Sequence, residues 1–228
     1  FGGCVLPRYG FCAVMFDLSY GYRAYIGVIF SPCRLVRELQ DNDIVPINGV
    51  DLNDIHLPGH CREEVVFWQA DSRQMFSGDH LLPDVTPVCL LEFPETVDGE
   101  RVHTLSQYYR SADKVLPYEA RYIYPSHGDV FQDHRELVKG YKLSTERRLL
   151  KISKILEQGE LLTPLEVGQQ LFPKAWEDQL YAVISEVMGH LDLLLDEGFV
   201  ATQEVAGVMH YKLLAIPGPG AIFKRVMY

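Results

Sequence analysis

The chain has 228 residues, of which 47% are hydrophobic and 23% charged, and its formal net charge is −10. These values are typical of a globular protein, and the negative charge argues against a polyanion such as nucleic acid as the main partner. No run of 18 apolar residues occurs, so a membrane span is not expected. The five cysteines are widely spaced without a CxxC pair, which favours a reducing compartment and predicts a cytoplasmic protein.

The first part of the chain predicts β-structure. Residues 1–33 are rich in aromatic and β-branched side chains with scattered Gly and Pro, a composition that favours strands and turns. Asn48-Gly49 is a strong hairpin signal, and the strand that follows it, Val50 to Leu57, leads into a Pro-Gly turn that carries His60.

A second hairpin is expected next. Its strands are Val65–Trp68 and Met75–Phe76, on either side of a polar turn. Residues 81–88 contain two prolines and predict a loop. A helix over 105–114 with Thr104 as N-cap then precedes a strand at 121–124.

After Asp129 the pattern becomes helical. A long helix is expected over 132–158, followed by a short helix that Thr163, Pro164 and Glu166 begin as a capping box. A third helix over 176–197 precedes a two-stranded hairpin. Three helices and a hairpin indicate a winged helix. We therefore predict two domains, residues 1–131 and 132–228.

The expected helix over 176–197 does not favour nucleic-acid binding. It contains neither Lys nor Arg, whereas a helix that enters a nucleic-acid groove needs cationic contacts to phosphates. We interpret the C-terminal module as a structural cap, a homodimer contact or a wall of the substrate pocket.

Three side chains share one setting. His60, Asp79 and His127 each follow a predicted strand and have a glycine close by. Any one of them alone would fit a structural role. Together, two histidines and an aspartate are the ligand set that zinc and related divalent ions use. The sequence therefore predicts a metal site.

The segments around these residues resemble three metal motifs of the metallo-β-lactamase superfamily. LPGH (57–60), FSGDHLL (76–82) and YPSHGDV (124–130) are similar to the second, third and fourth motifs. The resemblance implies an α+β fold, an αββα sandwich followed by an all-α or winged-helix domain as in one branch of the family. It also implies two metal ions, zinc first with iron or manganese as alternatives. His60 would bind one ion, His127 the other, and Asp79 would bridge them.

The family's first motif, HxHxDH, does not occur in this sequence. Phe1-Gly2-Gly3 resembles the segment that follows that motif, so we expect it to precede Phe1, which makes the sandwich N-terminally truncated here. A degenerate homologue is the alternative. Three ligands do not complete two four-coordinate sites, so the chain by itself could be inactive.

The resemblance implies a metal-dependent hydrolase that uses a metal-activated water. The expected substrate is a small acyl compound, an ester, thioester or lactone, as in glyoxalase II-like enzymes. His80, directly after Asp79, is the candidate catalytic side chain. The alternatives are an RNA or phosphodiester hydrolase of the same fold and a non-catalytic interaction protein built on a degenerate hydrolase fold.

Overall fold

The computed structural model describes residues 37–92, 100–159, 161–176 and 179–223. The chain divides into two compact units. The described residues of the first are 38–90, 103–147 and 220–223, and those of the second are 37, 91–92, 100–102, 148–159, 161–176 and 179–219. The boundary predicted at residue 131 remains a prediction. Within the described ranges no helix is both long and apolar enough to cross a membrane.

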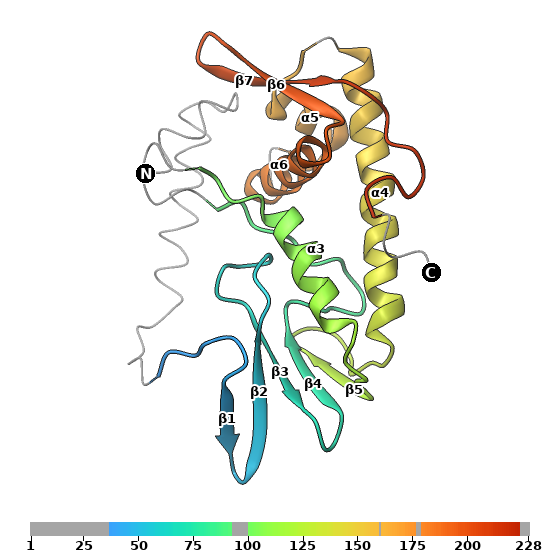
Figure 1. The fold of residues 1–228 in the computed structure, drawn as a ribbon. Helices are drawn as coiled ribbons and strands as arrows, with labels where there is room; N and C mark the ends of the chain where they lie inside the picture. Colours follow the sequence, from blue (N-terminus) through green and yellow to red (C-terminus); the bar gives the residue numbers. More distant parts are fainter. Residues whose placement is uncertain (1–36, 93–99, 160, 177–178, 224–228) are drawn as a thin grey trace. The chain divides into compact units, whose positions relative to one another are not determined.

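The first unit is built on a five-stranded sheet with the order β1-β2-β3-β4-β5 (Figure 1). All neighbours are antiparallel except β4 and β5, which are parallel. Both predicted hairpins are confirmed. The turn residues Asn48 and Gly49 have φ angles of 52° and 80°, the left-handed values that a two-residue hairpin turn requires. The strands are β1 (Ile44–Ile47), β2 (Val50–His56), β3 (Val65–Gln69), β4 (Gln74–Gly78) and β5 (Tyr122–Pro125).

One face of this sheet is buried. Each of the four strands β2 to β5 contributes to it one side chain that is at most 4% exposed: Ile55, Val66, Met75 and Ile123. Helix α3 (Thr104–Val115) lies in the connection between the parallel strands β4 and β5. Trp68, on the buried face, meets the ring of Tyr118 just after α3 edge-on. The prediction of Thr104 as N-cap was wrong, because His103 is the N-cap, Thr104 is already helical, and no side chain caps this end.

The opposite face of the sheet carries exposed apolar side chains toward β1 and the turns. Ile47, Val50 and Phe76 are 50, 43 and 38% exposed, and they line a groove of about 580 Å³. A second sheet of the predicted sandwich does not occur among the described residues, and the strands predicted in residues 1–33 lie outside them.

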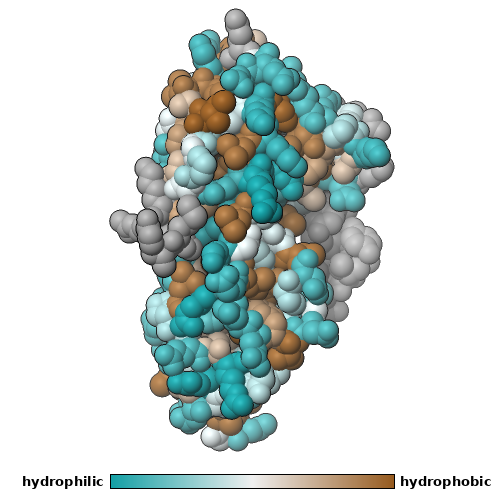
Figure 2. Space-filling view, turned by 90° about the vertical axis from the view of Figure 1, so that its right-hand side faces the viewer, coloured by the Kyte–Doolittle hydropathy of each residue, from teal (hydrophilic) through white to brown (hydrophobic). Residues whose placement is uncertain are grey.

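Helix α4 (His134–Gln158) begins two residues later than predicted. Its N-terminus is capped by Asp133, whose Oδ1 accepts the N–H of Glu136 at 3.1 Å. Its first turns belong to one unit and its last turns to the other. Figure 2 views the side on which α4 lies. Hydrophilic side chains cover much of this face, and hydrophobic side chains form separate patches on it.

The second unit holds two helices and a hairpin. Helix α5 (Pro164–Leu171) begins with the predicted capping box between Thr163 and Glu166. It packs on α6 (Leu180–Asp196), which precedes the antiparallel pair β6 (Val200–Val205) and β7 (Val208–Leu213). Leu162 also pairs with Tyr211 of β7. These elements were expected, but their assignment as a winged helix remains a prediction.

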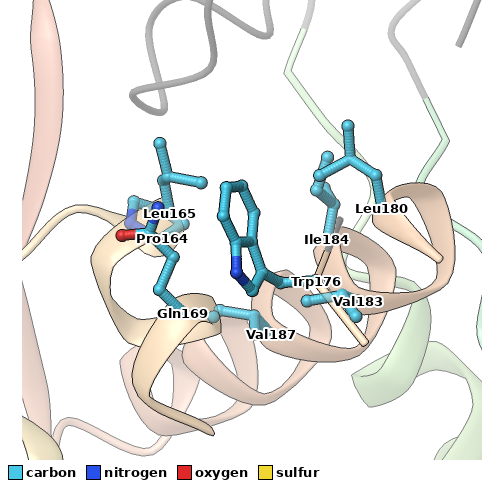
Figure 3. A pocket seen from close by; sticks show the side chains of 9 residues that line it. Pro164, Leu165, Gln169, Trp176, Leu180, Val183, Ile184 and Val187 are labelled. Atoms are coloured by element: carbon cyan, nitrogen blue, oxygen red, sulfur yellow. The ribbon is translucent and has the colours of Figure 1, made fainter. Parts of the chain in front are cut away.

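A small apolar hollow lies between α5 and α6. Trp176 points into it, between Leu165 on one side and Leu180 and Ile184 on the other (Figure 3). Among the described residues that line it, none has a titratable side chain, and Gln169 carries the one side-chain amide. The side chains around the hollow therefore pack α5 against α6, and none of them is a candidate catalytic group.

Candidate metal centre

The strand directions bring the three predicted metal ligands to one edge of the sheet. Because β3 is antiparallel to both β2 and β4, β2 runs in the same direction as β4, and β5 runs parallel to β4. His60 follows β2, Asp79 follows β4 and His127 follows β5. All three therefore lie at the carboxyl ends of strands that point the same way, where open sheets commonly bind ligands.

Asp79 lies between the two histidines. His60 Nε2 is 3.5 Å from Asp79 Oδ2, and His127 Nε2 is 3.7 Å from Asp79 Oδ1. Two ligands of one tetrahedral ion are about 3.4 Å apart when the metal–ligand bonds are about 2.1 Å long. Each histidine–carboxylate pair thus has nearly the separation of two neighbouring ligands, and each pair uses a different oxygen of Asp79.

Two ligands do not complete a coordination sphere. In the ranges that the structure describes, no group of three or more His, Cys, Asp and Glu side chains is arranged to hold a metal ion. The donors that are present fit a bridging scheme by chemistry and spacing, but they supply only two protein ligands for each ion. Further ligands would have to come from outside the described residues.

The ring of His60 is oriented by a backbone carbonyl. Its Nδ1 lies 2.7 Å from the carbonyl oxygen of Val88. Because a carbonyl only accepts hydrogen bonds, Nδ1 carries the proton, and in the neutral ring Nε2 presents a lone pair. That lone pair faces a carboxylate oxygen of Asp79. Two electron-rich atoms this close favour a cation between them, and histidine metal ligands are commonly held through their other nitrogen in this way.

The turn that carries His127 is tied to Asp79. The Ser126 hydroxyl donates to Asp79 Oδ1, and the Ser126 N–H donates to the carbonyl of Gly78 at 3.0 Å. The side chains of His60 and Asp79 are 22% and 33% exposed, and that of His127 is 77% exposed. Hydrogen bonds therefore join the loop that carries Asp79 to the loop that carries His127, while the side chains of the predicted metal ligands remain accessible to solvent.

Hydroxyl groups from two helices hold the loops on which these residues lie. Tyr108 on α3 donates to the carbonyl of His80 at 2.8 Å. Tyr141 on α4 donates to the carbonyl of Leu82 and accepts the N–H of the same residue at 2.8 Å. Ser111 donates to the carbonyl of Pro58 at 2.7 Å. No local sequence pattern indicates these partners, because they lie about 30 to 60 positions away along the chain.

The side chain of His80 is fully buried. Neither ring nitrogen has a hydrogen-bond partner among the described residues. Burial, and secondarily His60, lowers the pKa of His80 to about 3, so its ring is neutral at physiological pH. A catalytic role for His80 remains a prediction.

Glu64 is a further residue of this site that the sequence reading did not single out. Its side chain is only 8% exposed, and burial raises its pKa. Oε1 accepts the N–H of Asp79 at 3.1 Å, and Oε2 accepts the thiol of Cys61 at 3.5 Å. Burial and the neighbouring Glu64 raise the pKa of Cys61 to about 12, so the thiol stays protonated and is a poor nucleophile.

Comparisons with known proteins agree with the family resemblance. No protein-family model matches the chain. It is 27% identical to the probable metallo-hydrolase YqjP of Bacillus subtilis over 160 residues, 70% of this chain and 50% of the relative. It is 25% identical to an atrochrysone carboxyl ACP thioesterase of Cryptosporiopsis over 144 residues, 62% of this chain and 41% of the relative.

Among solved structures, a metallo-β-lactamase family protein of Thermus thermophilus matches with a TM-score of 0.67 and 24% identity, over 80% of this chain and 56% of that one. The chain thus spans about half the length of the proteins it matches. The described part of the chain therefore shares the α+β fold of this solved structure, and the relatives that it resembles in sequence are named a probable metallo-hydrolase and a thioesterase.

Proposed function

We propose that the protein is a metal-dependent hydrolase that acts on an ester, thioester or lactone. One metal ion would be held by His60 and Asp79 and a second by His127 and Asp79, with zinc as the first choice and iron or manganese as alternatives. The remaining ligands of each ion would come from outside the described residues. The C-terminal helices and hairpin would form a winged-helix cap of the kind that one branch of the superfamily carries.

One observation carries the proposal. His60 Nδ1 donates to the Val88 carbonyl, so in the neutral ring Nε2 presents its lone pair to Asp79 Oδ2 at 3.5 Å, a separation too long for a direct hydrogen bond. A structural histidine–aspartate hydrogen bond would instead place a proton on the nitrogen that faces the carboxylate and bring the two atoms to about 2.7–2.9 Å. The observed arrangement favours a cation shared by the two groups.

The residues of the chain would have distinct roles in such a reaction. Two bound ions would lower the pKa of a water molecule and polarise the scissile group. His60 and His127 would present neutral ring nitrogens, and Asp79 would offer one oxygen on each side while the Ser126 hydroxyl orients its carboxylate. Thioesters are the first choice of substrate because a relative is named as an acyl-carrier thioesterase.

The test uses the natural full-length protein. We expect close to two metal ions per chain by elemental analysis, and metal-dependent hydrolysis in a panel of thioesters, esters and lactones. Asp79→Ala should lose metal and activity. Asp71→Ala, at the exposed turn between β3 and β4, is the matched control and should retain both.

Two results would overturn the proposal. A full-length protein without bound metal or hydrolytic activity would favour an interaction protein built on a degenerate fold. Chelator-sensitive cleavage of RNA in the same panel, without hydrolysis of any acyl substrate, would replace the acyl substrate by a phosphodiester.

A further inference from the structure

The buried carboxylate of Glu64 joins the two loops that carry His60 and Asp79. Glu64 is the last residue before β3. Its Oε1 accepts the backbone N–H of Asp79, and its Oε2 accepts the thiol of Cys61, the residue next to His60. One side chain therefore contacts both predicted ligand loops, although Glu64 and Asp79 are 15 positions apart.

The neighbouring glycine shows how closely Glu64 fits. A Cβ atom at Gly78 would lie 2.7 Å from Glu64 Oε1, which is shorter than real Cβ contacts allow. Gly78 also has a φ of +54°, a backbone conformation that residues other than glycine rarely adopt. The space that a side chain at position 78 would fill is thus occupied by the carboxylate.

Hydrogen bonds, and not an ion pair with Lys or Arg, accompany the burial of this carboxylate among the described residues. In the part of the chain that the structure describes, no Lys or Arg forms an ion pair with it. A buried carboxyl group is costly unless it is hydrogen-bonded, and here both of its bonds go to residues that adjoin or belong to the candidate metal centre.

We propose that Glu64 is a positioning residue for the metal centre. It fixes the peptide of Asp79 relative to the His60 loop and so sets the separation of His60 Nε2 and Asp79 Oδ2. This inference rests on the proposed metal-dependent function. Loss of partners that orient metal ligands typically weakens metal affinity about 10–100-fold.

The reach of the side chain, more than its charge, should decide its effect. Glu64→Gln loses the charge but keeps an amide oxygen that can accept the Asp79 N–H. Glu64→Asp keeps the charge but is one methylene too short to make the same bond. We therefore expect the glutamine variant to bind metal more tightly than the aspartate variant.

The experiment titrates the metal-free full-length protein with Co²⁺ and follows the absorption bands of the bound ion, which report affinity and coordination geometry. Glu64→Ala and Glu64→Asp should bind Co²⁺ about 10–100-fold more weakly than the wild type. Glu64→Gln should recover most of the affinity. Glu63→Ala, at the exposed neighbouring position, should leave it unchanged.

The outcomes separate the two proposals. If the wild type binds Co²⁺ and the variants Glu64→Ala and Glu64→Asp bind it with the same affinity, the positioning role of Glu64 is overturned and the proposed function is not. Tighter binding by the aspartate variant than by the glutamine variant would have the same consequence, because charge would then matter more than reach. A wild-type protein that binds no Co²⁺ would overturn both this inference and the proposed function.

Discussion

Gly59 lies directly against the backbone of Tyr108. A Cβ atom at Gly59 would come within 2.4 Å of the Tyr108 Cα, and the φ of Gly59 is +148°. The turn that presents His60 therefore sits on helix α3 with no room for a side chain.

The variant Gly59→Ala should accordingly be destabilised by roughly 2–5 kcal/mol, from backbone strain and overpacking together. Chemical denaturation measures the change. Gly140→Ala in α4 is the control, because a Cβ there meets nothing within 4 Å and alanine favours a helix by about 0.5–1 kcal/mol. Equal stability of Gly59→Ala and the wild type would show that the turn can move off the helix.

Tyr141→Phe tests the attachment of the loop after Asp79. The change removes the hydroxyl that pairs with both the N–H and the carbonyl of Leu82, and buried backbone groups left unpaired cost about 1–3 kcal/mol. We expect a loss of stability in that range, measured by urea unfolding. Tyr118→Phe, which removes a hydroxyl without a hydrogen bond to any described residue, should change stability much less. Similar losses in both variants would contradict the assignment.

The buried ion pair of the second unit should show strong coupling. Arg101 donates to both carboxylate oxygens of Asp192, and the two side chains are 7% and 1% exposed. Asp192→Leu alone leaves a buried charge without this partner, which should cost about 3–5 kcal/mol. The double variant Arg101→Met, Asp192→Leu should lose less than the sum of the single variants. A double-mutant cycle that gives additive losses would argue that the pair is not coupled.

His190 on α6 should make the protein less stable in mild acid. Burial lowers its pKa, while Glu186, whose carbonyl accepts from Nδ1 at 2.7 Å, acts to raise it and the nearby Arg148 to lower it. In the unfolded chain a histidine binds a proton near pH 6.5. The unfolded state therefore takes up a proton that the folded state does not, and stability falls as pH decreases through about 6.5.

Urea unfolding between pH 5 and 8 measures this effect. His190→Leu removes the group that titrates, so its free energy of unfolding should depend less steeply on pH than that of the wild type. An unchanged slope would assign the acid sensitivity to other groups, among them His134, whose pKa is also lowered by burial.

Local interactions explain what the sequence by itself determined. The left-handed turn at Asn48-Gly49 and the capping box between Thr163 and Glu166 involve residues at most three positions apart, so residue types at fixed spacing suffice to predict them. The same holds for the placement of His60, Asp79 and His127 after strands. Thr104 shows the limit, because His103 occupies the N-cap although threonine is the better capping residue.

Only the tertiary structure decided how these pieces meet. Strand directions across the sheet bring His60, Asp79 and His127 to one edge, and the carbonyl of Val88, 28 positions from His60, fixes which ring nitrogen faces Asp79. Glu64 is buried between two loops, although its sequence neighbour Glu63 is exposed. Such contacts depend on strand register and packing between residues distant in the chain, which no local pattern of residue types encodes.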